Sequence, residues 1–196
     1  MLQIRIHGRG GQGVVSAAEM LSLAAFEQGR HAQAFPSFGS ERTGAPVVAF
    51  CRIDDQDIRL REPILEPDVL IVQDPTLLHQ VDVFQGLKPD GYALINSRHG
   101  LHALGLAEVG QRHRLERLIT VPASEIALEH LGRPLPNAVL LGGFAALTGL
   151  IALDAVAHAI RAKFSGALAE ANAAAAAEAF AFVRREMEEP AHDQAD

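Results

Sequence analysis

A glycine-rich turn near the N-terminus restricts the possible folds of this chain more than any other feature. Residues 2–7 alternate apolar and polar side chains, as a half-buried β-strand does, and residues 14–28 carry apolar side chains at helical spacing before Gly29. Between these segments lies a G-x-G-x-x-G pattern, and a strand, a glycine turn and a helix in this order predict the first unit of a Rossmann-like fold. The residues of the turn are Gly8, Arg9, Gly10, Gly11, Gln12 and Gly13.

Further short segments have the composition of β-strands. The runs at residues 68–74 and 91–97 are almost wholly apolar, which is typical of strands buried on both faces of a parallel sheet. An Asp-Asp-Gln-Asp turn at residues 54–57 predicts that the runs before and after it pair as an antiparallel hairpin. The predicted strands are residues 2–7, 31–35, 47–53, 58–60, 68–74, 91–97 and 118–122.

Helical patterns occupy residues 75–87 and most of the last third of the chain, where Asn137 and Asp154 are predicted to be N-caps. Strands that alternate with helices predict an α/β fold: a Rossmann-like open, mostly parallel sheet with an antiparallel hairpin and a helical C-terminal third. We expect a single domain over residues 1–187 and a polar, disordered tail at residues 188–196. The predicted C-terminal helices are residues 124–131, 137–150, 154–164 and 168–187.

Small residues leave the backbone of the predicted helix at 137–150 nearly bare. Glycine costs a helix up to about 1 kcal/mol per residue relative to alanine, so another element must press closely against this one. That element is either the sheet of the same domain or another chain at an interface, and the sequence leaves both readings open.

Composition excludes several classes of partner and cofactor. The chain has 24 Asp and Glu against 17 Lys and Arg, a net charge of -7, and no basic run, which argues against nucleic acid and anionic membranes. The single cysteine, Cys51, excludes an internal disulfide, a cysteine-rich zinc site and a four-cysteine cluster site. The N-terminus lacks the pattern of a secretory signal and no apolar run reaches about 18 residues, so a cytoplasmic location is expected.

The glycine turn suits an anion, because it lets a ligand approach bare backbone at the N-terminus of a helix. A dinucleotide site also needs an acidic residue about 20 positions later, at the end of the second strand. Residues 33–36 hold no such side chain, which disfavours NAD and FAD. A different anion, such as a phosphate, and a purely structural turn remain as alternatives.

A second group of glycine, hydroxyl and charged residues follows the second predicted strand. The carboxyl ends of parallel strands open onto one edge of a sheet, so we expect this loop beside the glycine turn, shaped for a carboxylate or phosphate. An ordinary surface turn is the alternative. No zinc-type histidine set or nucleophile motif is present, so no catalytic or metal-binding residue is predicted on this chain. The loop includes Ser37, Gly39, Glu41, Arg42, Thr43 and Gly44.

Together the two loops, GRGGQGVV at residues 8–15 and FPSFGSERTGAPV at residues 35–47, carry a resemblance to a known family. The sequence resembles the gamma chain, or gamma domain, of the 2-oxoacid:acceptor oxidoreductases, typified by pyruvate:ferredoxin oxidoreductase. The loops agree in type, order and spacing, and a DVLIVQD segment at 68–74 and a small-residue helix around NAVLLGG at 137–143 follow them. The resemblance covers residues 2–180.

The resemblance implies a complex that oxidatively decarboxylates a 2-oxoacid to an acyl-coenzyme A. Such a complex uses thiamine diphosphate, magnesium, 4Fe–4S clusters and coenzyme A, and passes electrons to ferredoxin or another acceptor. It implies alpha, beta and delta-type subunits as partners, which hold the cofactors, whereas this chain alone holds none and is inactive.

The resemblance also gives the two loops a role. They would complete the active site or form an interface, with coenzyme A or the substrate as candidate contacts. The 2-oxoacid itself stays open. The alternative is a free-standing Rossmann-like protein that binds a nucleotide or regulates another process.

Overall fold

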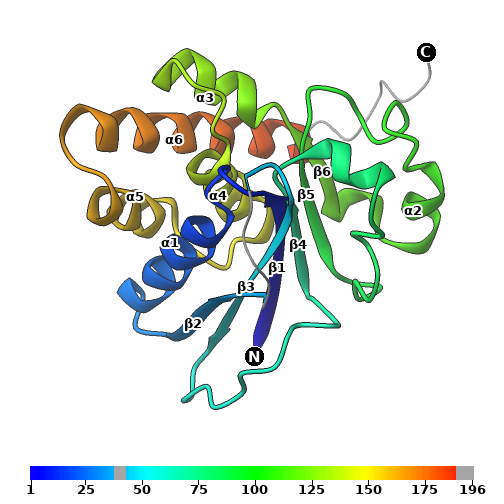
Figure 1. Cartoon of the computed structure of the whole chain (residues 1–196), viewed down its shortest axis with the longest axis horizontal. Coiled ribbons are helices and arrows are strands. Elements are labelled where there is room, and N and C mark those ends of the chain that lie inside the picture. The colour runs from blue at the N-terminus through cyan, green and yellow to red at the C-terminus, as the bar shows by residue number, and fades with distance from the viewer. Residues whose placement is uncertain (38–42, 189–196) are drawn as a thin grey trace.

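The strands form one mixed sheet, and most of the helices pack on one of its faces (Figure 1). The computed structural model describes residues 1–37 and 43–188. The sheet has six strands in the order β2-β3-β1-β4-β5-β6. The strands are β1 (Leu2–Arg9), β2 (His31–Pro36), β3 (Pro46–Asp54), β4 (Val69–Val72), β5 (Tyr92–Asn96) and β6 (Leu118–Val121).

Helices follow the strands in the order that the sequence predicts, and they dominate the last third of the chain. The predicted α/β class, with its mostly parallel sheet and helical C-terminal third, is confirmed. The helices are α1 (Val14–Glu27), α2 (Ala107–Arg112), α3 (Ala123–Leu131), α4 (Asn137–Thr148), α5 (Leu153–Lys163) and α6 (Gly166–Glu188), with short 3-10 helices η1 (Pro75–His79) and η2 (Leu115–Arg117).

The antiparallel part of the sheet differs from the predicted hairpin. Strands β1, β4, β5 and β6 are parallel, whereas β3 runs antiparallel to both of its neighbours, β1 and β2. The predicted pairing of residues 47–53 with 58–60 is therefore wrong. Both edges of β3 are already occupied by longer strands, and the backbone after residue 58 is held by a side chain instead: Arg52 Nη2 donates to the Glu62 carbonyl at 2.5 Å.

The helix predicted over residues 75–87 is also wrong beyond its first turn. Only η1 forms, and the Asp74 carboxylate caps it by accepting from the Thr76 N–H. In the rest of the segment, the carbonyls of Val83 and Gln85 accept from the buried guanidinium of Arg5, at 2.9 and 2.5 Å. These carbonyls are used by a distant side chain, so the segment follows a path set by β1 rather than by its own helical pattern.

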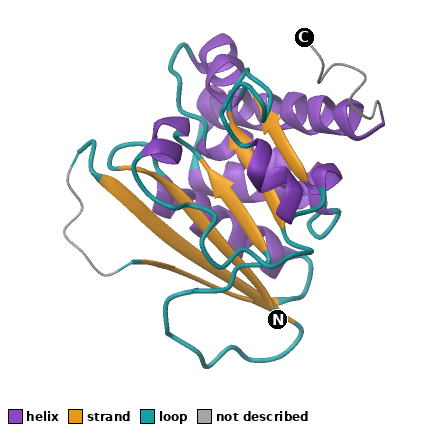
Figure 2. Cartoon of the chain, turned by 90° about the vertical axis from the view of Figure 1, so that its right-hand side faces the viewer, coloured by secondary structure: helices purple, strands orange, loops and turns teal. Residues whose placement is uncertain are grey.

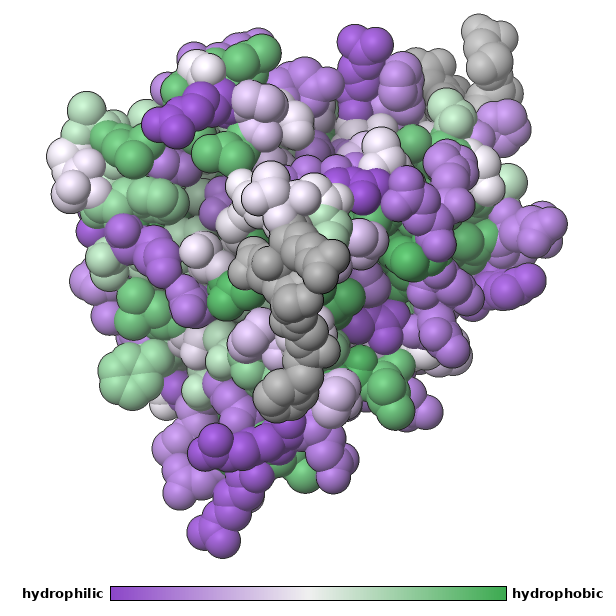
Figure 3. All heavy atoms as spheres, viewed as in Figure 1, coloured by the Kyte–Doolittle hydropathy of each residue, from purple (hydrophilic) through white to green (hydrophobic). Residues whose placement is uncertain are grey.

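Two apolar cores lie on opposite faces of the sheet. Alternate residues of one strand serve both, because Ile71 of β4 packs with the larger helices whereas Leu70 and Val72 face the other side. Figure 2, seen from the side of α2, shows the strands in front of the larger helices. On the face drawn in Figure 3, hydrophilic and hydrophobic residues are interspersed, and hydrophilic residues gather at its lower end.

Helix α4 lies at the centre of the larger core. Its residues from Asn137 to Leu147 are buried, and a Cβ on Gly142 would overlap the backbone carbonyl of Ala176 in α6. The small residues therefore serve packing within the chain, but the closest approach is to helix α6 and not to the sheet, which was the partner that the first of the two readings named. The predicted caps are wrong: Pro136 and Ala152 occupy the N-cap positions, and Asn137 is the first residue of α4 with a side chain that turns toward α1.

Both the domain boundaries and the tail stay predictions. Glu188 is the last residue of α6, and residues 189–196 lie outside the described part of the chain. Within residues 1–37 and 43–188, no helix is both long and apolar enough to cross a membrane.

Candidate functional site

The glycine turn lies at the carboxyl end of β1, where the chain enters α1. Gly13 is the N-cap of α1 and has a φ of +69°, in the left-handed region that glycine adopts without strain. A Cβ at this position would lie 2.5 Å from Nδ2 of Asn137, the first residue of α4. Glycine is thus needed twice at residue 13, once for the turn and once for the close approach of α1 to α4.

The N-terminus of α1 is open to a ligand. No side chain caps it and its first turn has no acidic residue, so its backbone N–H groups and the positive end of the helix dipole are available to an anion. A cavity of about 220 Å³ lies beside it. The cavity is lined by Gly11, Gln12, Gly13 and Ser16, and by Leu131, Arg133, Leu135, Asn137, Phe164, Leu168 and Asn172.

Different walls of this cavity have different chemistry. The glycine turn and Arg133 offer hydrogen-bond donors and a positive charge, whereas Leu131, Leu135 and Phe164 offer apolar surface. A ligand that joins an anionic group to a flat or apolar group suits such a space, because each part finds a matching wall.

The second predicted loop lies beside the glycine turn in its described part. The N–H of Gly10 donates to the Ala45 carbonyl at 2.9 Å, and the N–H of Gly44 donates to the Gly10 carbonyl at 3.0 Å. Thr43 forms a bridge with Gly10. Ser37 continues the ladder at the end of β2, where its N–H donates to the Val48 carbonyl. Gly39, Glu41 and Arg42 lie outside the described residues.

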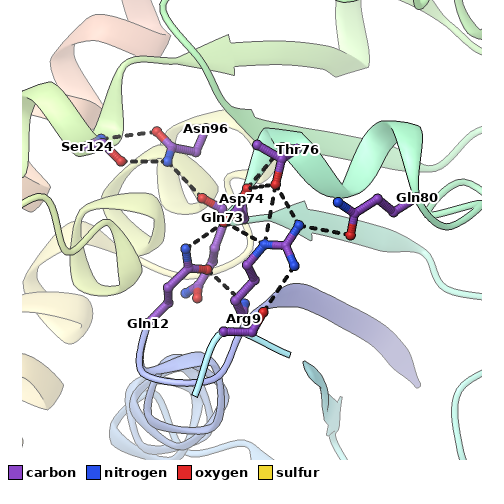
Figure 4. A network of polar contacts seen from close by, with 9 residues as sticks. Arg9, Gln12, Gln73, Asp74, Thr76, Gln80, Asn96 and Ser124 are labelled. Atoms are coloured by element: carbon purple, nitrogen blue, oxygen red, sulfur yellow. Dashed lines mark hydrogen bonds and ion pairs between the residues drawn. The ribbon is translucent and has the colours of Figure 1, made fainter. Parts of the chain in front are cut away.

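Arg9 was predicted as a site residue, but its guanidinium is engaged within the chain (Figure 4). Its Nε lies 3.2 Å from Oδ2 of Asp74, and its Nη2 donates to Thr76 Oγ1 at 2.8 Å and to Gln80 Oε1 at 2.9 Å. Nη1 donates to the Gly44 carbonyl at 3.1 Å. Arg9 therefore joins the two loops and is not a free cation for a ligand.

The amide of Gln12 is engaged with the ends of the strands. It donates to Asp74 and accepts from the backbone N–H of Arg9, each at 2.8 Å. Partial burial raises the pKa of Asp74, but hydrogen bonds from Thr76 and Gln12 and the charge of Arg9 outweigh this effect, and the pKa lies below its ordinary value. Asp74 is thus a carboxylate anchored between the two loops.

A second polar group lies at the carboxyl ends of β4 and β5. Asn96 Nδ2 donates to the Gln73 carbonyl and to Ser124 Oγ, both at 2.8 Å, and Asn96 Oδ1 accepts from the Ser124 N–H. The amide of Gln73 itself is 1% exposed and has no hydrogen-bond partner among the described residues. A Cβ on Gly8 would lie 2.6 Å from Cγ2 of Val14 and 3.0 Å from this oxygen, so a larger residue at position 8 would force these side chains to shift.

Sequence reasoning missed Asp74, Asn137 and Arg133 as parts of this site. Asp74 ends the strand next to β1, so the rule that carboxyl ends of parallel strands share an edge offered a signal. No comparable signal marked Asn137 or Arg133, because only the packing of α4 against α1, and of α3 against α4 and α6, brings them to the cavity.

Among the described residues, no three His, Cys, Asp or Glu side chains lie close enough together to hold a metal ion. Cys51 is buried in β3, and burial raises the pKa of its thiol to about 12. A thiol with that pKa stays protonated at neutral pH and is a poor nucleophile.

This fold and site define a class: a Rossmann-like α/β protein whose glycine turn leads into the uncapped N-terminus of a helix beside a cavity. The chain matches the family described as pyruvate ferredoxin/flavodoxin oxidoreductase over residues 3–182. The chain therefore belongs to this family.

Relatives specify the type of subunit. The common subunit gamma of the pyruvate/ketoisovalerate oxidoreductases of Thermococcus kodakarensis is 50% identical over 182 residues, which cover 92% of this chain and 96% of that protein. The pyruvate synthase subunit PorC of Methanosarcina barkeri is 52% identical over 83% of this chain and 86% of its own length. The crystal structure of the pyruvate oxidoreductase subunit PORC of Thermotoga maritima has 35% identity, a TM-score of 0.77, and coverage of 92% and 95%.

The resemblance to the gamma chain is thus confirmed. The chain is a gamma-type subunit of a multisubunit 2-oxoacid oxidoreductase, and other subunits of that enzyme are its partners. The free-standing alternative is not favoured.

Proposed function

We propose that this gamma subunit works in a pyruvate-oxidising complex with alpha, beta and delta-type subunits. In this proposal, the partners hold thiamine diphosphate, magnesium and 4Fe–4S clusters, and the electrons leave to ferredoxin or another acceptor in the cytoplasm. Two observations support it: pyruvate is in the names of the relatives, and one cysteine cannot supply the usual four ligands of a cluster.

We further propose that the glycine turn and the adjoining cavity receive coenzyme A. The observation that carries this step is the uncapped N-terminus of α1, which opens into a cavity with both Arg133 and apolar side chains on its walls. Coenzyme A joins phosphates to an adenine ring, so the N–H groups of the turn and Arg133 would bind phosphate, and the apolar wall would bind the base. The coenzyme supplies the thiol that accepts the acyl group.

Substitution of Arg133 in the assembled complex tests the coenzyme A site. Arg133→Ala is expected to raise the apparent KM for coenzyme A about 10-fold, the loss of one charged hydrogen bond of about 1.5 kcal/mol, with the KM for pyruvate unchanged. Arg112→Ala is the matched control, because Arg112 is an exposed arginine on α2, across the sheet. An unchanged KM for coenzyme A in an intact Arg133→Ala complex would contradict the proposed site.

Arg42 separates two roles for the second loop. If Arg42 contacts coenzyme A or the 2-oxoacid, Arg42→Ala raises the apparent KM for that ligand and leaves the complex intact on gel filtration. The rise corresponds to a loss of about 1.5 to 3 kcal/mol of binding free energy, that of one charged hydrogen bond. If the loop is an interface, the same variant loosens the complex and leaves the KM of what still assembles unchanged. A variant that is normal in both measurements would leave neither role.

A further inference from the structure

A network of side-chain hydrogen bonds holds the glycine turn (Figure 4). In each of these bonds the chemistry of the groups fixes which one donates and which one accepts. At the end of β4, Asp74 Oδ2 accepts from Gln12 Nε2 at 2.8 Å. Gln12 Oε1 in turn accepts from the backbone N–H of Arg9 at 2.8 Å. The side chain of Gln12 therefore connects the carboxyl ends of β4 and β1, and it fixes the path that the turn takes into α1.

Asp74 is also connected to the second loop. Its Oδ2 lies 3.2 Å from Nε of Arg9, whose Nη1 donates to the carbonyl of Gly44. Its Oδ1 accepts from the N–H and the hydroxyl of Thr76, at 2.9 and 2.6 Å. Gln12 Nε2, Arg9 Nε and both Thr76 donors thus point at one carboxylate that is 13% exposed, so both loops depend on the same charged group.

We propose that Asp74 is the positioning residue of the coenzyme A site. It does not touch the ligand; it sets the backbone of the glycine turn through Gln12 and that of residues 43–45 through Arg9. The inference rests on the proposed function for the identity of the ligand, and on the hydrogen bonds above for the positioning itself.

The fixed donor and acceptor roles at Asp74 and Gln12 allow a test by substitution. In Asp74→Asn, Oδ1 can keep its contacts with Thr76, which turns the new NH2 group toward the donors Gln12 Nε2 and Arg9 Nε. A flip of the Gln12 amide cannot repair this, because its NH2 group would then face the N–H of Arg9. In the double variant Asp74→Asn/Gln12→Glu, one oxygen of the new carboxylate accepts from the new amide, and the other accepts from the Arg9 N–H. The double variant therefore restores both hydrogen bonds.

Amide hydrogen exchange in the full chain measures positioning without a ligand. Asp74→Asn is expected to speed exchange at residues 10–15 by at least about 10-fold, and the double variant to bring it back to within about threefold of the wild type. Asp68→Asn is the matched control: Asp68 accepts from the Gln3 N–H at 2.8 Å and from Lys88 at 2.6 Å, but it precedes β4 and lies at the opposite end of that strand. Its variant should leave exchange at 10–15 unchanged.

Kinetics of the assembled complex then connect the turn to the ligand. Asp74→Asn is expected to raise the apparent KM for coenzyme A about 5- to 10-fold, with kcat and the KM for pyruvate within about twofold of the wild type. Asp68→Asn should show no such loss. The double variant is compared by exchange alone, because its new carboxylate at residue 12 lines the cavity and would itself repel the phosphates. A general loss of stability would not be repaired by moving the carboxylate to residue 12.

The outcomes separate the two proposals. Unchanged exchange at residues 10–15 in Asp74→Asn overturns the positioning role. Faster exchange with an unchanged KM for coenzyme A also overturns it, provided that Arg133→Ala raises that KM. If Arg133→Ala has no effect on the KM either, the coenzyme A site itself is wrong, whereas faster exchange in Asp74→Asn would still show that this carboxylate holds the turn.

Discussion

At the scale of single residues, β1 places two basic side chains, Arg5 and His7, on the sheet face opposite the larger core. The segments around Ile64 and residues 83–85 cover Arg5 there. The guanidinium of Arg5 donates to carbonyls of Val83 and Gln85 and so fastens a segment that forms no helix. His7, two residues on, is 8% exposed, and its Nε2 has no hydrogen-bond partner among the described residues. Burial, and then the charge of Arg5, lower the pKa of His7 to about 4. The ring is therefore neutral in the folded protein at neutral pH.

His7 should make stability depend on pH. Its pKa is about 4 when folded and 6.5 when unfolded, so the unfolded chain binds more protons between these values. The free energy of unfolding should then fall by up to about 3 kcal/mol as the pH drops from 6.5 to 4. Urea titrations at pH 7, 5.5 and 4.5 measure this. His7→Gln should flatten the dependence, whereas His31→Gln, at an exposed position, should not; equal slopes in both variants would refute this origin.

At the scale of elements, the contact between α4 and α6 depends on one glycine. A Cβ at Gly142 would overlap the Ala176 backbone, which can move only if the helices separate. A Cβ at the neighbouring Gly143 would meet side chains only, Leu94 at 3.1 Å and Val183 at 3.4 Å, and these can shift.

A pair of alanine variants isolates this packing. Both substitutions gain the same helix propensity, about 1 kcal/mol, so the difference between them reports the contact. Gly142→Ala is expected to be less stable than Gly143→Ala by about 1 to 3 kcal/mol in urea unfolding. If the two variants unfold at the same urea concentration, the close approach of α4 to α6 is not what requires glycine at residue 142.

Local patterns predicted the elements well where neighbours in the sequence decide the structure. The strands β1, β4, β5 and β6, and the helices of the last third, follow from apolar spacing, and the glycine turn follows from its own residues. The errors at 58–60 and 75–87 occur where backbone carbonyls accept hydrogen bonds from side chains, of Arg52 in the preceding strand and of the distant Arg5. The site shows the same division, because Asn137 and Arg133 join it only through tertiary packing.

At the scale of the whole molecule, nearly the full chain corresponds to one subunit of a larger enzyme, with 92% of it and 96% of the Thermococcus relative aligned. Among residues 1–37 and 43–188, no three side chains of metal-binding type gather to hold an ion, and the sequence has a single cysteine. We therefore expect that the purified chain, given pyruvate, coenzyme A, thiamine diphosphate and magnesium, reduces no viologen dye. Addition of the partner subunits should restore reduction, and dye reduction by the chain alone would refute the division of labour.

The native mass of the particle that contains this chain shows whether the chain works as a subunit of a larger enzyme. The chain should be tagged in its own host and purified without denaturant, and the particle should be examined by native mass spectrometry and visible absorbance. We expect one complex that contains this chain together with larger subunits and shows the brown absorbance of iron–sulfur clusters. A colourless particle built only from copies of this chain would contradict it.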